Sequence, residues 1–334
     1  MTPTVSVVMP VFNGEPFLTE ALESILSQSY QDFECLVVND GSTDSTSETL
    51  ARFARIDSRV HIITQSKRGV VVSLNAGVQA AKGRYIVRMD ADDIAVPERF
   101  KWQVQLMEQC PEIGISGGWV ELFGDRNEIW HHRQHDNHIR NMLLFKTSGF
   151  SHSTIIARRE LLQRFAFESR FPHVEDTANW VRIALNGKVK FANLPQVLVK
   201  YRIHSRQVSE QYKRQQNASY RGIIGYYLRG LGVDYNDVEL DLHMLVAKAC
   251  KVDSLEIIVA AGNWLKKLTG LLSTQLRDEY GVFQERWLKL CENNCHLEGL
   301  ENILSHYNFS PLEALDHHPT INPQNLTSNI AREI

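Results

Sequence analysis

Hydrophobic positions in the first third of the chain follow two alternating spacings. Short apolar runs rich in β-branched residues predict buried strands, and polar residues follow each run. Between these runs, apolar residues recur at the three-and-four spacing of an amphipathic helix. The predicted strands are 5–13, 33–38, 60–64 and a run beginning at Tyr85, and the predicted helices are 17–29, 45–56 and 70–81. This alternation is typical of βαβ units, so it predicts an α/β fold with a mainly parallel central sheet.

The polar residues at the strand ends are the first candidates for chemistry. Asn13 and Asp40 close two strands, and Asp90, Asp92 and Asp93 follow a third. Because ligands bind at the carboxyl ends of strands in such sheets, we expect these residues to meet at one edge, where a nucleotide would lie. Three neighbouring carboxylates repel one another, and a divalent cation holding a diphosphate is the simplest compensation. The alternative is a solvated acidic turn.

Composition and charge narrow the class of protein. The chain has 334 residues, of which 43% are hydrophobic and 22% charged, and its net charge of −3 gives no argument for a nucleic-acid partner. No apolar stretch approaches the ~20 residues that span a bilayer, and the N-terminus does not resemble a signal peptide. We therefore expect a cytoplasmic protein with five reduced cysteines. Cys291, Cys295 and His296 fit one helical face, and no second pair of zinc ligands accompanies them.

Several motifs resemble family 2 glycosyltransferases, and they cover roughly the first two thirds of the chain. They are residues 7–14 (VVMPVFNG), 37–44 (VVNDGSTD), 75–77 (NAG), 90–93 (DADD), 174–180 (VEDTANW) and 199–204 (VKYRIH). The resemblance implies an inverting hexosyltransferase with a GT-A-type nucleotide-sugar-binding sandwich. Segments 88–95 and 201–209 more closely resemble bacterial lipooligosaccharide β-1,3-N-acetylhexosaminyltransferases. The expected domains are a GT-A catalytic domain (1–209), a helical C-terminal region (210–316) and a loosely ordered tail (317–334).

The resemblance assigns a donor site to the strand ends. Asp92 is expected to bind Mn²⁺ or Mg²⁺, and Asp90 to contact the ribose or a metal-bound water. Asp40 is expected to accept a hydrogen bond from the uracil ring, although an acid at this position can equally stabilise a turn. His204 is expected at the metal or diphosphate, its alternative being a structural histidine. The remaining residues expected around the nucleotide are Pro10, Val11, Asn13, Ala91 and Arg68, the last with an exposed arginine as its alternative.

The acceptor side of the site is expected near the start of a predicted helix. By resemblance, Asp176 is the general base and Glu175 orients the acceptor or the base. Two acids at this position can also simply complement the helix dipole. His152 and Trp180 are expected to bind the acceptor. Thr177 stands where the family often has an aromatic residue, which leaves the acceptor pocket less defined than the base.

The resemblance implies transfer of GlcNAc or GalNAc from a UDP-sugar to a terminal sugar of a surface glycan such as lipooligosaccharide or O-antigen. A lipid-linked acceptor would bring the enzyme to the inner face of the cytoplasmic membrane. Residues 254–276, with an apolar face and Lys266-Lys267 at its edge, are a candidate peripheral helix, and packing against the catalytic domain is the alternative.

Two other functions remain open. A nucleotide-sugar-forming nucleotidyltransferase usually has a glycine-rich basic loop after its first strand, and here the loop reads PVFNGE. A non-catalytic carbohydrate-binding protein would leave Asp90, Asp92 and Asp176 as costly unused acids.

Overall fold

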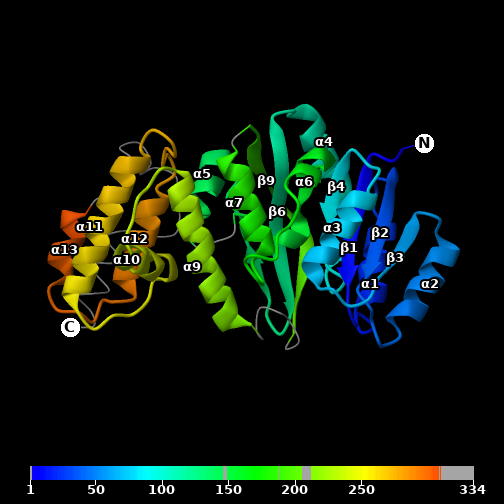
Figure 1. Ribbon diagram of the computed structural model, residues 1–334, viewed down its shortest axis with the longest axis horizontal. Helices are drawn as coiled ribbons and strands as arrows, with labels where there is room; N and C mark the ends of the chain where they lie inside the picture. Colours follow the sequence, from blue (N-terminus) through cyan, green and yellow to red (C-terminus); the bar gives the residue numbers. More distant parts are fainter. Residues whose placement is uncertain (1, 146–148, 187, 205–211, 308, 310–334) are drawn as a thin grey trace. The chain divides into compact units, whose positions relative to one another are not determined.

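The computed structural model describes residues 2–145, 149–186, 188–204, 212–307 and 309 (Figure 1). The chain divides into two units. The α/β unit comprises Met1–Asp136 and Phe150–Ser219, and the helical unit comprises Asn137–Gly149 and Tyr220–Ile334. The division falls inside α9 (Lys213–Gly230). The predicted boundary at 209–210 and the predicted tail 317–334 lie outside the described residues, so the domain limits stay a prediction.

A nine-stranded sheet forms the centre of the α/β unit (Figure 1). Its strands are β1 (Val5–Val11), β2 (Phe33–Asn39), β3 (Val60–Thr64), β4 (Tyr85–Arg88), β5 (Ile94–Ala95), β6 (Ile113–Gly124), β7 (Glu128–Trp130), β8 (Ile156–Arg158) and β9 (Lys190–Ile203). The order is β3-β2-β1-β4-β8-β6-β9-β5, with β7 paired to β6.

Strand direction changes within this sheet. The pairs among β1, β2, β3 and β4 are parallel, as the alternating pattern predicts. Strand β8 runs antiparallel to both β4 and β6, whereas β6 and β9 are parallel. The expected α/β class is therefore confirmed, and the second half of the sheet is mixed.

Helices cover both faces of the sheet. They are α1 (Leu18–Leu26), α2 (Thr46–Ile56), α3 (Val70–Ala80), α4 (Arg99–Gln109), α6 (Arg159–Arg164) and α7 (Glu175–Leu185). Val7 and Met9 of β1 share one apolar core with Leu22 of α1 and Phe100 of α4. On the other face α3 lies so close that a Cβ on Gly77 would be 2.4 Å from a methyl group of Val8. Coverage of both faces explains why β1 reads as a continuous apolar run.

Hydrogen bonds join the loops that follow β1 and β2. The Asn13 N–H donates to Ser42 Oγ at 2.9 Å, and the Thr43 N–H donates to Asn13 Oδ1 at 2.8 Å. Asn13 adopts a left-handed conformation with φ of 52°, which asparagine tolerates better than most residues. The loops at the carboxyl ends of these strands therefore form one connected edge.

The helical unit contains α10 (Asp237–Lys248), α11 (Leu255–Leu272), α12 (Val282–Glu292) and α13 (Leu300–His306), together with parts of α5 (Asp136–Met142) and α9. The apolar face of α11 is buried within this unit, including Ile258, Trp264 and Leu268. Lys267 pairs with Glu239 of α10 at 2.6 Å. This corrects the expectation of a peripheral membrane helix at 254–276, because its apolar face is already packed against protein.

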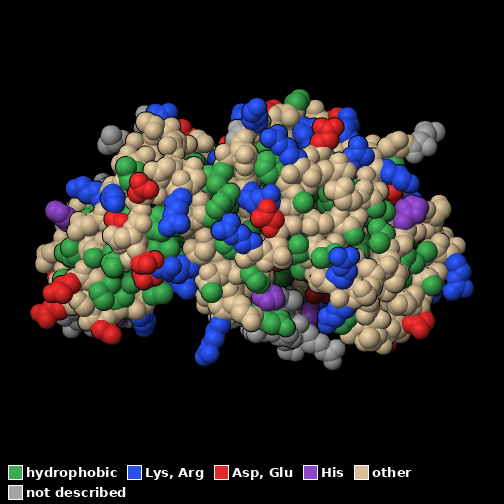
Figure 2. Space-filling model, in the orientation of Figure 1, with side chains coloured by type: hydrophobic (Ala, Val, Ile, Leu, Met, Phe, Trp, Pro, Cys, Tyr) green, Lys and Arg blue, Asp and Glu red, His purple; other side chains and the backbone are tan. Residues whose placement is uncertain are grey.

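Charges of both signs are mixed on one face of the molecule, and the cysteines are thiols. Figure 2 shows lysine and arginine side chains dispersed among polar and acidic ones on that face. None of the five cysteines, all of which lie in the described part of the chain, forms a disulfide, and burial raises the pKa of Cys291 to about 12. Among the described residues no helix has the length and hydropathy needed to cross a membrane.

Candidate active site

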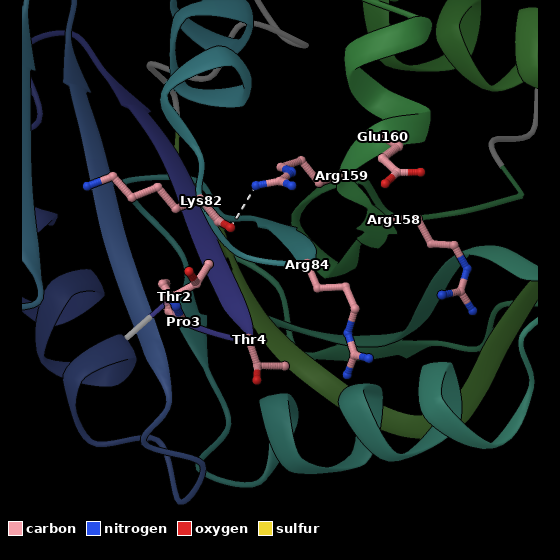
Figure 3. Close-up of a pocket in the computed structure, with 8 residues that line it drawn as sticks. All are labelled: Thr2, Pro3, Thr4, Lys82, Arg84, Arg158, Arg159 and Glu160. Carbon is pink, nitrogen blue, oxygen red and sulfur yellow. Dashed lines mark hydrogen bonds between the residues drawn. The ribbon is translucent and has the colours of Figure 1, made fainter.

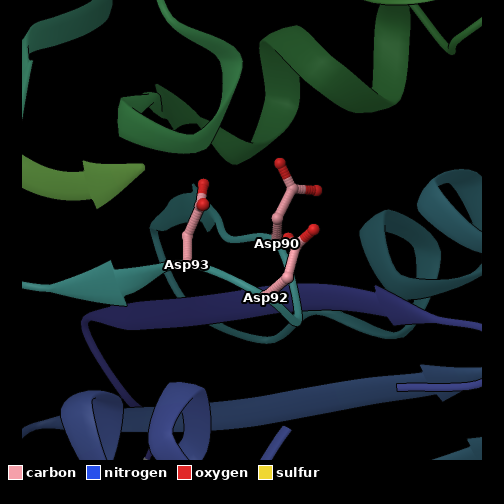
Figure 4. A group of neighbouring side chains, drawn as sticks. All are labelled: Asp90, Asp92 and Asp93. Atoms are coloured by element: carbon pink, nitrogen blue, oxygen red, sulfur yellow. The ribbon is translucent and has the colours of Figure 1, made fainter. Parts of the chain in front are cut away.

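Three acids lie together in the turn between β4 and β5 (Figure 4). Asp90, Asp92 and Asp93 each offer a carboxylate oxygen, and these oxygens lie within 4.8 Å of one another. Asp93 is almost fully buried and accepts a hydrogen bond from the Arg202 N–H at 3.0 Å. Burial and the charges of Asp90 and Asp92 raise its pKa well above its usual range. Asp93 therefore attaches β9 to the turn, whereas Asp90 and Asp92 remain partly accessible.

Positive side chains from two other segments oppose Asp90. Arg88, at the end of β4, pairs with its carboxylate, and His152 Nε2 lies 2.9 Å from Asp90 Oδ2. Burial raises the pKa of Asp90, but the charges of Arg88 and His152 outweigh burial and hold it far below its ordinary value. Asp90 is therefore a carboxylate at neutral pH. Arg99, fully buried in α4, adds a third cation near the acids and donates to the Arg88 carbonyl at 2.9 Å.

Asp92 and His204 form the part of the cluster that best fits a divalent cation. His204 Nε2 lies 3.1 Å from Asp92 Oδ2. Burial and the neighbouring Asp90 raise the pKa of Asp92, and a bound cation would reverse this effect by favouring the ionised form. Carboxylate oxygens and a neutral imidazole are ligands that Mn²⁺ accepts, and carboxylates suit Mg²⁺. The side chains present thus fit the expected metal, and the structure brings the two expected metal ligands together.

His152 lies beside Asp176, on the side of the site where the acceptor is expected, and it also faces the donor acid Asp90. It lies in the short helical turn η1 (His152–Thr154), and its two ring nitrogens face two carboxylates. Nε2 is 2.9 Å from Asp90 Oδ2, and Nδ1 is 3.1 Å from Asp176 Oδ2. Burial and Arg88 lower the pKa of His152, but Asp90 and Asp176 outweigh them and raise it to about 10. The ring is therefore a doubly protonated bridge between acids, which leaves neither nitrogen for an acceptor hydroxyl.

Asp176 and Glu175 lie in the first turn of α7. Asp176 Oδ1 accepts a hydrogen bond from the Thr177 N–H at 2.6 Å, and Oδ2 faces His152. Burial raises the pKa of Asp176, but the hydrogen bond and charge of His152 bring it below its ordinary value. Burial and Asp176 raise the pKa of Glu175. The pKa of Asp176 therefore lies below its ordinary value and that of Glu175 above its own.

Trp180, expected at the acceptor, is a core residue. Its side chain is only 2% exposed, and its ring packs edge-on against Phe150 and Phe167 with centroid distances of 5.9 and 6.2 Å. Helical periodicity places Trp180 one turn from Asp176 on α7 but does not show which side of the helix faces the interior. The structure corrects this assignment.

Asp40 organises the loop that leads into α3. It is buried, its Oδ1 accepts from Gln65 Nε2 at 2.7 Å and from the Arg68 N–H at 2.8 Å, and its Oδ2 accepts from the Gly69 N–H at 2.8 Å. Burial raises its pKa, and these hydrogen bonds lower it overall. The local turn is instead made by Asn39, whose Oδ1 accepts from the Ser42 N–H at 3.0 Å. Asp40 therefore shapes the nucleotide edge, and the Arg68 side chain is exposed beside it.

Side chains at the end of β1 and in β9 differ in exposure and partners. The Val11 side chain is buried in the core, so Val11 can line a base pocket only through its backbone, whereas Pro10 and Ala91 are half-buried. Arg202 of β9 pairs with Glu20, and its Nε donates to the Asp92 carbonyl at 2.9 Å.

Phe12 is a residue that the sequence reasoning missed. Its ring is 40% exposed, and Lys67 Nζ lies 3.8 Å from the ring centre. An exposed aromatic ring immediately after a buried strand offers a flat surface for a nucleobase. The feature of the sequence that could have identified it is an aromatic residue between the end of the apolar strand and Asn13.

A cavity of about 430 Å³ lies at the amino ends of the parallel strands, whereas the acid cluster lies at their carboxyl ends (Figure 3). It is lined by Thr2, Pro3, Thr4, Lys82, Arg84, Arg158, Arg159 and Glu160. Arg159 donates to the Lys82 carbonyl at 2.7 Å, and Arg158 donates to the Ile113 carbonyl at 2.9 Å. These guanidinium groups hold backbone segments together, so the cavity differs in chemistry from the acid cluster.

Comparison with known proteins identifies the family. The profile of glycosyl transferase family 2 matches residues 6–171. A Haemophilus influenzae protein described as an uncharacterized glycosyltransferase is 33% identical over 250 residues, which is 70% of this chain and 76% of that protein. The Escherichia coli UDP-Glc:alpha-D-GlcNAc-diphosphoundecaprenol beta-1,3-glucosyltransferase WfgD is 29% identical over 216 residues, covering 63% of this chain and 83% of the enzyme.

The fold has a solved counterpart. The crystal structure of S. aureus TarS residues 1–349 with UDP-GlcNAc superposes with a TM-score of 0.58 and 17% identity, over 91% of each chain. This likeness shows the fold, and the matching relatives are described as glycosyltransferases. They do not support the nucleotidyltransferase or non-catalytic alternatives. The chain is an enzyme and belongs to glycosyltransferase family 2.

Proposed function

We propose that this glycosyltransferase is an inverting, metal-dependent enzyme that transfers N-acetylhexosamine from a UDP-sugar to the terminal sugar of a lipid-linked surface glycan. One observation carries the proposal. A single imidazole, His152, lies 2.9 Å from Asp90 at the donor acids and 3.1 Å from Asp176, the proposed base. Donor and acceptor chemistry thus meet within one network of side chains.

The donor half of the proposal rests on the connected loops. Phe12 offers a partly exposed ring to the uracil, and the loop that Asp40 organises closes the edge beside it. S. aureus TarS was crystallised with UDP-GlcNAc and WfgD is named for UDP-Glc, which supports a UDP-sugar donor here. A divalent cation held by Asp92 and His204 would neutralise charge that develops on the leaving diphosphate.

The acceptor half rests on Asp176. Its lowered pKa keeps it ionised at neutral pH, so it can remove the proton from an acceptor hydroxyl. The hydroxyl oxygen then forms a bond to the anomeric carbon as the bond from that carbon to the diphosphate breaks. UDP departs with the bonding electrons, and the proton stays on Asp176. One displacement inverts the anomeric centre.

The surface-glycan acceptor is proposed from the relatives. WfgD is named for a diphosphoundecaprenol-linked acceptor, and an E. coli relative of 30% identity is named as an O-antigen biosynthesis glycosyltransferase. An acceptor of this kind would place the enzyme at the inner face of the cytoplasmic membrane. The chain's own packed α11 does not support direct insertion there.

A donor panel tests the function without any assumption about the acceptor. The enzyme is incubated with Mn²⁺ and with UDP-GlcNAc, UDP-GalNAc, UDP-Glc or UDP-Gal, and release of UDP is measured. Hydrolysis of a UDP-N-acetylhexosamine that EDTA abolishes supports the proposal. Hydrolysis that prefers a UDP-hexose would replace the proposed sugar, and metal-independent turnover would remove the metal assignment.

The stereochemistry is tested separately. With an active donor and a lactose-type acceptor, NMR of the product should show a β linkage from the α-linked UDP-sugar. An α-linked product would contradict single displacement with Asp176 as base.

A further inference from the structure

Trp130 is a large exposed aromatic residue that the donor site does not use. It lies at the end of β7, and its side chain is 38% exposed. Its ring stacks on Tyr201 of β9 with a centroid distance of 6.3 Å and an interplanar angle of 30°. In β6, Val120 lies opposite Trp130 and Leu122 lies opposite Tyr201. Because alternate residues of a strand share a face, both rings lie on the same face of the sheet, diagonally across β6.

Tyr201 connects this exposed ring to the proposed base. Its ring contacts that of His152 edge-on, with a centroid distance of 6.4 Å. His152 Nδ1 in turn lies 3.1 Å from Asp176 Oδ2. Burial and the charges of Asp93, Asp90 and Asp92 raise the pKa of Tyr201, so its ring is a neutral wall beside the acids. A continuous aromatic surface therefore leads from solvent at Trp130 to the reacting end of the site.

We propose that Trp130, supported by Tyr201, is the platform on which the acceptor sugar ring stacks. The inference rests on the proposed role of Asp176, because that residue defines where the acceptor hydroxyl must point. One face of a pyranose is lined by C–H bonds, and an indole covers such a face with a large, rigid apolar surface. Stacking there holds a terminal hexose or N-acetylhexosamine beside the base while its hydroxyls remain in water. The platform thereby selects for a sugar acceptor.

The neighbouring Ile129 supplies a matched control. It is also exposed, at 45%, and it belongs to the same short strand. Its side chain points to the opposite face of the sheet, because successive residues of a strand alternate. Ile129→Ala therefore removes apolar surface from β7 without touching the proposed platform.

Saturation-transfer NMR tests the platform directly. The probes are methyl glycosides of galactose, glucose and N-acetylglucosamine, added to the full chain with UDP and Mn²⁺. Wild type, Ile129→Ala and Asp176→Asn should all transfer saturation to the C–H protons of at least one glycoside. Trp130→Ala should lose that signal and Trp130→Phe should retain part of it, while calorimetry shows unchanged UDP affinity in both. Equal signals in wild type and Trp130→Ala, or no binding of any glycoside to wild type, would overturn the proposal.

Kinetics give a second readout where transfer is measurable. Trp130→Ala should raise the acceptor KM by roughly three- to tenfold, the factor that corresponds to one aromatic contact, with kcat and donor hydrolysis unchanged. An unchanged acceptor KM overturns the platform even if transfer itself proceeds as proposed. Failure of wild type to hydrolyse any UDP-sugar would instead contradict the proposed function, and the NMR measurement would still decide the platform.

Discussion

Strand β4 begins beside a basic cavity and ends at a cluster of acids, and the two ends use charge differently. At the start, Arg84 is mostly exposed and pairs with Glu108, while Arg158 and Arg159 donate to backbone carbonyls. At the end, Asp90 faces Arg88 and His152. At the first end Arg158 and Arg159 are held by backbone carbonyls, whereas at the second end Asp90 is held by two other side chains. A side chain can turn from its protein partner to a bound ligand, whereas a backbone carbonyl is fixed in place by the fold.

The cavity and the cluster of catalytic-type side chains lie at different ends of β4. The cavity at the basic end has a definite volume, and its cations hold the segments that form it. At the acid end, carboxylate and imidazole side chains from four separate segments lie within hydrogen-bonding distance of one another. Burying several charges together costs free energy unless each is paired, so such a cluster points to function more strongly than an opening does.

The largest effect is expected from Asp92→Asn. Loss of one ligand charge should lower turnover by at least about 100-fold and weaken UDP binding that depends on Mn²⁺. Calorimetry of UDP with and without Mn²⁺ measures the second effect. Glu160→Gln removes one carboxylate at the basic end of β4 and is the matched control. If both variants behave like wild type, the acid end has no special role in binding the donor.

Asp176→Asn should reduce transfer by about 10²- to 10⁴-fold, as expected for loss of a general base. Because Asp176 hydrogen-bonds to His152 and is not one of the residues proposed to hold the donor, UDP affinity in the presence of Mn²⁺ should be retained. Rapid transfer by this variant would remove Asp176 as the base. Loss of UDP binding would move the residue to the donor site.

His152→Gln should reduce activity by about 10- to 100-fold, the range typical of residues that position catalytic groups. Burial raises the pKa of Asp176, and His152 is the main influence that lowers it. The acid limb of the transfer rate against pH should therefore move to higher pH in the variant. A drop in activity with an unmoved acid limb would mean that His152 supports the fold without tuning the base.

Unfolding of the metal-free protein should depend on pH through the same histidine. The pKa of His152 is raised from 6.5 to about 10, so its contribution to stability is complete below about pH 6.5 and is lost as pH rises through about 10. The pKa values of Asp90 and Asp176 are lowered, so their contributions are lost at the acid end instead. The Tm of wild type should fall more steeply than that of His152→Gln between pH 6.5 and 10. Parallel curves would contradict the bridge.

The smallest effect is expected at the basic end. Arg84→Gln removes an exposed ion pair with Glu108, and such pairs contribute about 0–1 kcal/mol to folding. Transfer rates should not change, and Tm should move by only a few degrees at most. A large loss of transfer in this variant would show that the basic cavity takes part in the reaction after all.

The local pattern of the sequence predicts one half of the sheet far better than the other. The first four strands are apolar runs followed by polar residues, and the structure contains all of them. The other half was mostly missed. Strand β8 has only three residues, and β6 contains Gly117 and Gly118, which weaken a strand pattern. A Cβ on Gly117 would lie 2.5 Å from Asn193 Oδ1, so a contact remote in sequence explains this glycine.

Motif positions indicate where the candidate site residues lie, and the structure adds the direction of each side chain. The acids after β4 and the pair Asp92–His204 lie together as the motifs imply. His152 and Trp180 lie near the expected region, but one bridges acids and the other fills the core. Motif position indicates which part of a sheet a residue reaches, whereas its partners depend on segments far away in the chain.

The order of the proposed site residues along the chain has a consequence for recombination between related genes. On the proposed roles, residues that choose the nucleotide precede β5, whereas Trp130, His152 and Asp176 come after β6 has begun. Helix α4 separates these two stretches of sequence. On these roles, one genetic crossover within α4 would exchange the acceptor residues together with His204, while Phe12, Asp40 and Asp92 stay in place. Recombination of this kind would change the glycan without requiring a new activated sugar from the cell, provided that the exchanged segment keeps a histidine at position 204.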